Sequence, residues 1–328
     1  MKKIIIENNQ ANERIDKFLK TEFFSSRKAM PRDKYSRGEI IKKIKEGEVT
    51  VNSKKTRPSY ILKEGDVLRL ENFSKKKENK LVANDKIKLQ IIFENENIIV
   101  INKPAGLMVH PNHNEKTGTL ANALIKYFPK IKNVHDESKD AFLRPGIVHR
   151  LDKDTSGVLV VAKNKKTLVK LKKLFQDRKV TKKYMAVCEG IFEKKTGVIE
   201  KPIARSTSYS KQVIARKNTK TKIRKAVTEY KIIGEKGKYS VVEVFPKTGR
   251  MHQIRIHLAS EGHPVVGDLL YTEKHRIKQR NTETQKNTKI KAERQLLHAK
   301  EIKFEIFGQI YHFLAPVPKD FEDFLAKI

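Results

Sequence analysis

The stretch RPGIVHRLDKDTSG, residues 144–157, decides how the rest of the chain is interpreted. It predicts a strand at 146–150, a tight loop closed by Thr-Ser-Gly, and a second strand that begins at residue 158. A loop between two strands holds a side chain in a fixed direction at the edge of a sheet, which a catalytic group requires. Asp152 directly follows the first strand and is therefore the candidate catalytic carboxylate.

Asp154 lies two residues further along the same loop. Its short side chain suits a hydrogen bond to backbone amides of the turn, and we assign it that role. Because Asp-rich loops are most often ordinary turns, the loop alone does not decide whether Asp152 is catalytic. Two further segments bear on that question.

The first of these segments, KYMAV at residues 183–187, places Tyr184 in an apolar strand. An aromatic ring there either packs in the core or offers a stacking surface to a displaced base. The second segment, TGRMHQIRIH at residues 248–257, opens with a turn and enters a helix in which His252 and Arg255 share one face. An arginine on an otherwise packed helix needs an anionic partner, and Asp152 is a candidate.

The composition indicates a polyanionic partner. The 328 residues include 72 Lys and Arg against 38 Asp and Glu, a formal net charge of +34. Such a charge favours binding to nucleic acid first and to an acidic membrane surface second. A genome rich in lysine codons is the other explanation, but the lysine excess has no matching glutamate excess. RNA or DNA binding is therefore expected before any motif is considered.

The location of the protein follows from what the sequence lacks. Cys188 is the single cysteine, which excludes an internal disulfide and a thiolate metal cluster. The start MKKIII has too short an apolar run for a signal peptide, and no later segment approaches the ~20 apolar residues that span a bilayer. We expect a cytoplasmic protein without membrane contact.

Periodicity divides the chain into three parts. Residues 12–72 combine two helical patterns with short alternating strands, which predicts a small α/β domain. Residues 73–85 are polar without periodicity and are interpreted as a linker. Residues 86–328 predict an α+β domain with a largely antiparallel central sheet and flanking helices, because β runs follow one another without regular βαβ alternation. Within it, residues 273–295 form a basic insertion with few apolar anchors. Its strands are expected at 87–93, 98–102, 146–150, 158–163, 183–189, 226–233, 239–245 and 300–307, and its helices at 119–128, 165–178, 251–260 and 319–327.

The larger domain resembles the RluA-type pseudouridine synthases, a bacterial family that includes RluC and RluD and modifies large-subunit ribosomal RNA. The segments 144–157, 183–187 and 248–257 carry the resemblance, and GHPVVGD at residues 262–268 also fits the pattern. The resemblance implies the pseudouridine synthase fold. It also implies that Asp152 is the catalytic carboxylate, that Tyr184 packs against the uracil ring and that Arg255 forms an ion pair with Asp152.

The resemblance also indicates how RNA is held. Arg150 would fill the space left by the nucleotide that is turned out of the RNA, and Arg250 and His252 are further candidates for substrate binding. Residues 12–72 resemble the RNA-binding module named after ribosomal protein S4, in which Arg37 is the candidate RNA contact. We therefore expect a monomer whose partner is ribosomal RNA, free or in a pre-ribosomal particle.

The chemistry implied by the resemblance needs no cofactor and no metal. The target uridine is turned out into the site, and Asp152, kept ionised by Arg255, acts on its ribose. The carboxylate either attacks the anomeric carbon, as in retaining glycosidases, or removes the neighbouring sugar proton to give a glycal. The freed uracil rotates and is rejoined through carbon, and Tyr184 would assist the final loss of the ring proton.

Other functions are compatible with parts of the sequence. The basic surface alone would serve a non-catalytic RNA-binding ribosome-assembly factor, and a synthase that acts on transfer RNA is a further alternative. A glycoside or nucleoside hydrolase would pair Asp152 with Asp154, but two residues on one loop seldom flank a scissile bond. A zinc site at His252, His257 and His263 fits poorly, because the first two lie on different faces of the helix.

Replacing Asp152 by Asn separates these functions. We expect RNA binding to survive Asp152→Asn while uridine isomerisation is lost. Binding should weaken steeply with added salt, because phosphate contacts release counterions. Filter binding across a salt series, together with an isomerisation assay on the same samples, measures both. Normal isomerisation by the variant, or salt-insensitive binding, would contradict the interpretation.

Overall fold

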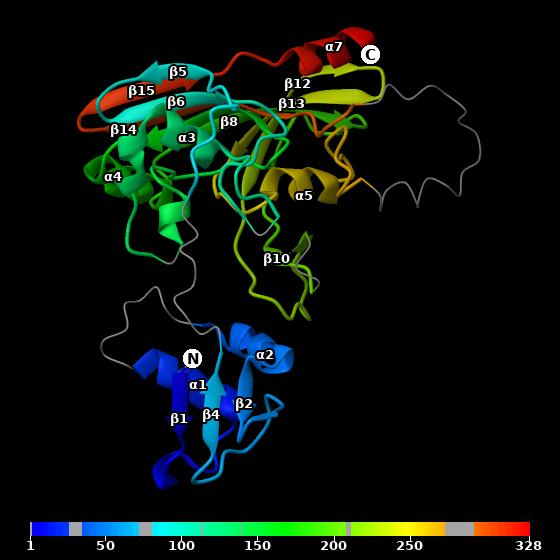
Figure 1. Ribbon diagram of the computed structural model, residues 1–328. Helices are drawn as coiled ribbons and strands as arrows, with labels where there is room; N and C mark the ends of the chain where they lie inside the picture. The colour runs from blue at the N-terminus through cyan, green and yellow to red at the C-terminus, as the bar shows by residue number, and fades with distance from the viewer. Residues whose placement is uncertain are drawn as a thin grey trace. The chain divides into compact units, whose positions relative to one another are not determined.

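The computed structural model describes residues 2–25, 35–71, 81–112, 114–138, 140–207, 211–272 and 292–328. The chain forms two compact units, Met1–Asn79 and Lys80–Ile328, which are considered separately below (Figure 1). Among the described residues, no helix is both long enough and apolar enough to cross a membrane.

The first unit is a small sheet with two helices packed on it. Its strands lie in the order β1-β4-β2-β3, and neighbours are antiparallel. β1 pairs along its whole length with β4, so the sheet begins ahead of residue 12, where periodicity placed the start of the domain. The second helix ends at Gly47, as its sequence predicts, with φ at 82°. The elements are β1 (Lys2–Ile5), η1 (Asn8–Gln10), α1 (Ile15–Ser25), α2 (Arg37–Glu46), β2 (Val49–Val51), β3 (Lys54–Lys55) and β4 (Val67–Leu70).

A nine-stranded sheet runs through the second unit in the order β5-β6-β7-β14-β8-β13-β12-β9, with β15 also paired to β14. Among the described strands only β7 and β14 pair in parallel, which confirms the expected α+β class with a largely antiparallel sheet. A separate two-stranded sheet joins β10 and β11. The strands are β5 (Ile91–Glu94), β6 (Ile98–Lys103), β7 (Ser156–Ala162), β8 (Thr181–Glu189), β9 (Thr196–Ile199), β10 (Ile203–Arg205), β11 (Gln212–Ile214), β12 (Thr228–Lys236), β13 (Tyr239–Pro246), β14 (Leu297–Ile306) and β15 (Gln309–Leu314).

All four helices expected in the second unit are present. One of them, α5, begins two residues later than predicted, because His252 adopts a left-handed backbone conformation with φ at 54° and precedes the first helical turn. Two short 3-10 helices lie between the second and third strands of the unit. The helical elements are α3 (Leu120–Tyr127), η2 (Pro129–Asn133), η3 (Ala141–Leu143), α4 (Lys165–Gln176), α5 (Gln253–Ser260) and α7 (Lys319–Lys327).

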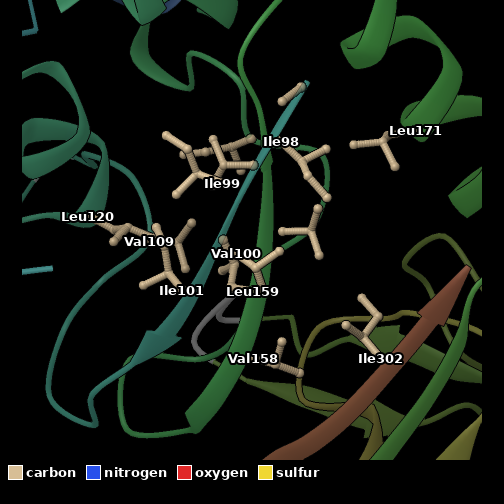
Figure 2. Close-up of a cluster of buried hydrophobic side chains, with 14 of the residues drawn as sticks. Ile98, Ile99, Val100, Ile101, Val109, Leu120, Val158, Leu159, Leu171 and Ile302 are labelled. Carbon is tan, nitrogen blue, oxygen red and sulfur yellow. The ribbon is translucent and has the colours of Figure 1, made fainter. Parts of the chain in front are cut away.

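The core around β6 explains why its sequence is a continuous apolar run. Figure 2 shows Ile99 and Ile101 on the side of the strand where Leu120 of α3 lies, and Leu171 of α4 on the other side. Because helices cover both faces, every residue from Ile98 to Ile101 is buried.

The other half of the sheet is also covered on both faces. In β8, Met185 and Val187 pack in the apolar cluster that contains Phe321 of α7. The alternating residues Ala186 and Cys188 pack in the cluster that contains Leu258 of α5. Figure 1 accordingly shows α5 and α7 on opposite sides of β12 and β13. Since side chains alternate along a strand, Tyr184 points to the side of α5.

The strand predicted at 146–150 is wrong. Only Ile147 forms a bridge, to Val161 of β7. Two residues further on, the Val160 amide donates to Nε2 of the His149 side chain at 2.9 Å, where a paired strand would offer a backbone carbonyl. The His149 side chain thus takes the place of a backbone acceptor in the hydrogen-bond ladder. The segment continues into the Asp152 loop without forming a strand.

Parts of the expected linker and of the expected basic insertion belong to the folded second unit. Residues 73–80 of the expected linker and 273–291 of the expected insertion lie outside the described residues. Leu81 packs against the core, and the Val82 carbonyl accepts a hydrogen bond from Asn122, so this part of the linker belongs to the second unit. Arg294 and Gln295 also bond to the second unit, whereas the sequence placed them in the insertion.

Four strands of the second unit, β9, β10, β11 and β15, were not predicted. The first three have four residues or fewer, which is too short for alternation to be detected. β15 alternates weakly, and only Tyr311 is buried within it. These strands exist because neighbouring elements supply their hydrogen-bond partners.

Gly157 provides a test of the parallel junction between β7 and β14. Its φ is 116°, and a Cβ there would lie 2.2 Å from the Ala299 carbonyl oxygen. We expect Gly157→Ala to destabilise the second unit by about 2 kcal/mol or more, through backbone strain and the clash. Gly262→Ala is the control, because φ is 91° but a Cβ would meet nothing within 4 Å. Calorimetric melting of the full chain compares them, and equal losses would contradict this account.

Candidate active site

One cavity of about 770 Å³ in the second unit gathers the candidate residues of that unit. It lies where the end of the Asp152 loop, β8 and the start of α5 meet. Lys182 and Arg224 are among the eight Lys and Arg side chains that line it. Among the described lining residues, Asp152 is the one acidic side chain. The candidate residues in its wall are Arg150, Asp152, Tyr184, Arg250, His252 and Arg255.

The centre of the cavity is an ion pair between Asp152 and Arg255. Nη1 of Arg255 donates to Oδ2 of Asp152 at 3.1 Å, and 16% of the Asp152 side chain is exposed. The second carboxylate oxygen, Oδ1, lies 3.9 Å from Nε2 of His252. One oxygen of Asp152 is thus held by the guanidinium, while the other carries no close hydrogen bond among the described residues.

Arg255 is held in turn by a second carboxylate. Asp268 is buried and accepts from Nε of Arg255 at 2.6 Å and from Nη2 at 2.9 Å. Burial opposes the charge of Arg255, but Asp268 and then Asp152 raise its pKa above the ordinary value. The bidentate pair fixes the plane of the guanidinium and aims its remaining nitrogen at Asp152.

Tyr271 covers this arrangement. Its ring centroid lies 5.3 Å from the guanidinium carbon of Arg255, and its hydroxyl accepts from the Gln212 amide at 3.1 Å. Burial raises the pKa of Tyr271 to about 12, so the hydroxyl keeps its proton, and its oxygen lies at hydrogen-bond distance, 3.0 Å, from Nδ1 of His252. Burial also lowers the pKa of His252, which is therefore neutral near pH 7.

Tyr184 reaches the cavity from β8, on the face that the alternation of the strand predicts. Burial, and then the charge of Asp152, raise the pKa of Tyr184 well above its usual range. The phenol therefore remains protonated at neutral pH. This favours a packing or donor role, and it argues against the expected assistance to proton removal, because a base must be deprotonated first.

The loop that carries Asp152 is anchored from several directions. Lys103 is fully buried at the end of β6, and its Nζ donates to three backbone oxygens, among them that of Lys153 at 2.9 Å. Burial lowers the pKa of Lys103 to about 7. The three backbone oxygens oppose this effect, because they match the three N–H groups of the charged ammonium. Arg294 donates to the Asp154 carbonyl at 3.0 Å, and Gln295 donates to the Thr155 hydroxyl at 2.8 Å.

The turn-stabilising role assigned to Asp154 is wrong. In the described part of the chain its carboxylate accepts no backbone amide, and the hydrogen bond that closes the turn runs from the Thr155 amide to the Asp152 carbonyl at 3.2 Å. Asp154 acts on the loop through its backbone oxygen, which Arg294 holds. The sequence could not reveal this, because Arg294 is 140 residues away.

Two arginines lie at the rim of the cavity. Arg150 is exposed, and its guanidinium has no hydrogen bond or ion pair within the described ranges. Arg250 is tied by its Nε to the Lys225 carbonyl at 3.2 Å, and its amide donates to the buried Gln253. Arg150 is therefore free to move with a bound RNA, whereas Arg250 is partly fixed.

Arg37 belongs to the first unit and does not line this cavity. Its Nη2 lies 2.7 Å from the buried carboxylate of Asp16, which also accepts from Arg14. Desolvation opposes the charge of Asp16, but its hydrogen bonds to the two arginines hold its pKa below the usual value. Arg37 thus ties α2 to α1, and 46% of its side chain remains exposed.

The histidines considered for a zinc site have separate partners. His257 lies between the Thr228 hydroxyl and the Lys201 carbonyl, at 2.9 Å from each. His263 stacks on Phe192 with ring centroids 3.8 Å apart. Among the residues that the structure describes, no group of three or more His, Cys, Asp or Glu side chains is placed to hold a metal ion.

The roles of Asp268, Tyr271 and Lys103 were not predicted from the sequence. The segment that ends at Asp268 was noticed, but no role was given to it. The glycine before Asp268 was a signal in the sequence. In the structure a Cβ on Gly267 would lie 1.9 Å from the Arg294 carbonyl oxygen, so the close approach of the two backbones requires a glycine beside Asp268. Lys103 carried no signal, since a lysine at the end of a strand is ordinarily exposed.

Two family models match the chain, one in each unit. Residues 97–260 match the family model described as RNA pseudouridylate synthase, and residues 34–68 match that of the S4 domain. An uncharacterized RNA pseudouridine synthase of Aquifex aeolicus (strain VF5) is 41% identical over 267 residues, 79% of this chain and 77% of the relative. The ribosomal large subunit pseudouridine synthase D of Pseudomonas aeruginosa is 36% identical over 289 residues, 88% and 86% of the two chains. The solved structure of human RNA pseudouridylate synthase domain containing 4 aligns with a TM-score of 0.56 at 26% identity, over 73% of this chain and 92% of that one.

Asp268 is predicted to position Arg255. We expect Asp268→Asn to lower the turnover number for uridine isomerisation about 10- to 100-fold with little change in KM, because Arg255 loses its bidentate partner and no longer holds Asp152 in place. Glu235→Gln is the control, since Glu235 pairs with Lys195 at the surface and neither residue lines the cavity. Steady-state kinetics on folded variants measures the effect. A rise in KM alone would argue against a positioning role.

Proposed function

Because the chain belongs to the RNA pseudouridylate synthase family, we propose that it isomerises specific uridines to pseudouridine in large-subunit ribosomal RNA. The chain is a pseudouridine synthase; the proposal concerns its substrate and the roles of its residues. The relative named ribosomal large subunit pseudouridine synthase D, which aligns over most of both chains, supports this choice of RNA.

The observation that carries the proposal is the lone carboxylate of Asp152, held 3.1 Å from Arg255 in an otherwise cationic cavity. The cations attract the phosphates of RNA, and the low water content of a recessed site strengthens each charge interaction. The carboxylate is then the one described group in the wall that carries negative charge toward a ribose. Its free oxygen Oδ1 is the atom that acts on the sugar.

Asp152 opens the glycosidic bond by one of two routes. Oδ1 either forms an ester with the anomeric carbon while uracil leaves through N1, or it takes the neighbouring sugar proton and leaves a glycal. Uracil then rotates, and its C5 bonds to the anomeric carbon as the ester bond to Asp152 breaks or, in the glycal route, as Asp152 returns its proton to the sugar. The hydrogen on C5 is then lost as a proton, and N1 gains a proton. In both routes Arg255 stabilises the ionised carboxylate before and after the reaction.

The other residues of the cavity hold the nucleotide. Tyr184 packs against the uracil as a neutral phenol, which excludes water from the freed base. Arg150, with its unpaired guanidinium, fills the gap that the displaced nucleotide leaves in the RNA and so offsets the cost of unstacking. Arg250 contacts the substrate at the rim, and the neutral His252 contacts it near Asp152 without adding charge.

The first unit is proposed to dock the RNA. Its S4 domain match supports binding to structured RNA. Arg37 keeps nearly half of its side chain exposed while it pairs with Asp16, so it can meet a phosphate without moving. We further propose that the enzyme works as a monomer in the cytoplasm, on free ribosomal RNA or a pre-ribosomal particle. All six candidate residues of the cavity come from one chain, which supports the monomer.

Mapping of pseudouridine in cells tests the proposal. Selective chemical labelling of large-subunit ribosomal RNA from cells with and without the gene should show that one or more labelled uridines lose their label. The wild-type gene should restore them, and Asp152→Asn should not. Asp154→Asn, which removes the same charge from the same loop, should restore them as well. If no site in large-subunit RNA loses its label and one in transfer RNA does, the proposed substrate is wrong.

A further inference from the structure

A second cavity, of about 670 Å³, adjoins the catalytic one. The two share six lining residues, among them Arg150, Lys182 and Tyr184. Arg150 and Tyr184 therefore stand in the wall between the cavities. A nucleotide chain whose target base enters the first cavity has its neighbouring residue close to the second.

The charge of the second cavity is of one sign. Seven Lys and Arg side chains line it, and no Asp or Glu does so among the described residues. Two of these cations are already neutralised, since Lys172 pairs with Asp136 at 2.5 Å and Lys247 pairs with Glu229 at 2.7 Å. The cavity keeps a net positive charge that its own wall does not balance.

Four of the cations have no partner. In the part of the chain that the structure describes, the side chains of Arg144, Arg150, Arg178 and Lys182 form no hydrogen bond or ion pair. Lys182 is partly buried and lies two residues before Tyr184 on the same face of β8, and burial lowers its pKa to about 8. A buried amine without a carboxylate is costly unless an anion meets it.

Arg178 occupies an unusual backbone position. It follows the C-terminal end of α4 with φ at 60°, in the left-handed region that glycine fills at the ends of helices. An arginine at this position costs backbone energy that a glycine would avoid. In this strained conformation the Arg178 side chain lines the second cavity.

The floor of the cavity is aromatic and uncharged. His149 stacks on Phe175 with ring centroids 4.6 Å apart and an interplanar angle of 21°. Because Nε2 of His149 accepts the Val160 amide, and burial lowers its pKa to about 3, the imidazole is neutral at physiological pH. A flat, neutral pair beneath unpaired cations has the chemistry of a site for a nucleotide, with its phosphate on the cations and its base on the rings.

From this geometry we infer that the second cavity binds the nucleotide next to the target uridine in the same RNA strand. Arg144 and Arg178 hold its phosphate, and Arg150 stands between this nucleotide and the one that reacts. The inference rests on the proposed function, because it takes the ligand to be the substrate RNA. It extends that function by assigning sequence-neighbour recognition to residues outside the catalytic cavity.

The salt dependence of RNA binding tests the inference. The probe is an unmodified hairpin transcript that contains the uridine identified by mapping, whichever RNA carries it. We expect Arg144→Gln with Arg178→Gly to raise Kd about tenfold and to lower the slope of log K against log salt by about 0.7, since the contact with one phosphate is lost. Arg178→Gly relieves backbone strain, so the melting temperature should not fall. Lys173→Gln with Lys179→Gln is the control of equal charge, because both lysines are exposed and lie outside the cavity wall.

Neutral linkages in the RNA locate the contact. A methylphosphonate beside the target uridine should weaken binding to the wild type, and it should have little further effect on the double variant, because both changes remove the same contacts. Additive losses, or a double variant that matches the control, would overturn the inference. A wild-type protein that makes no pseudouridine in ribosomal RNA, while hairpin binding still depends on Arg144 and Arg178, would refute the proposed substrate and support the cavity.

Discussion

The site depends on one guanidinium held between two carboxylates. Arg255 gives two nitrogens to the buried Asp268 and the third to Asp152. Arg255, Asp152 and Asp268 together carry a net charge of −1. They lie at the edge of a cavity whose other charged side chains, among the described residues, are cationic. Without Asp268 the arginine would be free to swing toward either Asp152 or an RNA phosphate. The buried pair removes that choice and fixes the direction of Asp152.

The fold serves this geometry through the junction between β7 and β14. These strands pair in parallel, in contrast to the other described pairs of the sheet, and bring the Asp152 loop beside the segment that carries Arg294 and Gln295. Lys103 closes the loop from the side of β6. Lys103, Arg294 and Gln295 donate to backbone oxygens and a hydroxyl of the loop. The loop is therefore held without the use of the Asp152 carboxylate.

The cationic side chains of the described residues fall into two groups, those that are paired with a carboxylate and those that are not. Some cations are already paired, as Arg37 is with Asp16 and Arg294 with Asp320. Others, such as Arg150, have no partner within the described ranges and face a cavity. The net charge of +34 therefore does not spread evenly as a binding surface. Among the described residues, Arg144, Arg150, Arg178 and Lys182 are unpaired and line the second cavity, where they would orient a polyanion as well as attract it.

The sequence by itself determined the class of the fold and the α-helices of the second unit, through periodicity. It also indicated the residues that meet at the cavity, through local motifs and the family that they resemble. Tertiary structure decided the rest. The segment at 146–150 is no strand because the His149 side chain takes the place of a backbone acceptor, and Asp154 serves through its carbonyl because Arg294 reaches it across 140 residues. The roles of Asp268 and Lys103 likewise arise from contacts between distant segments. Such contacts leave no periodic trace, so only the folded chain reveals them.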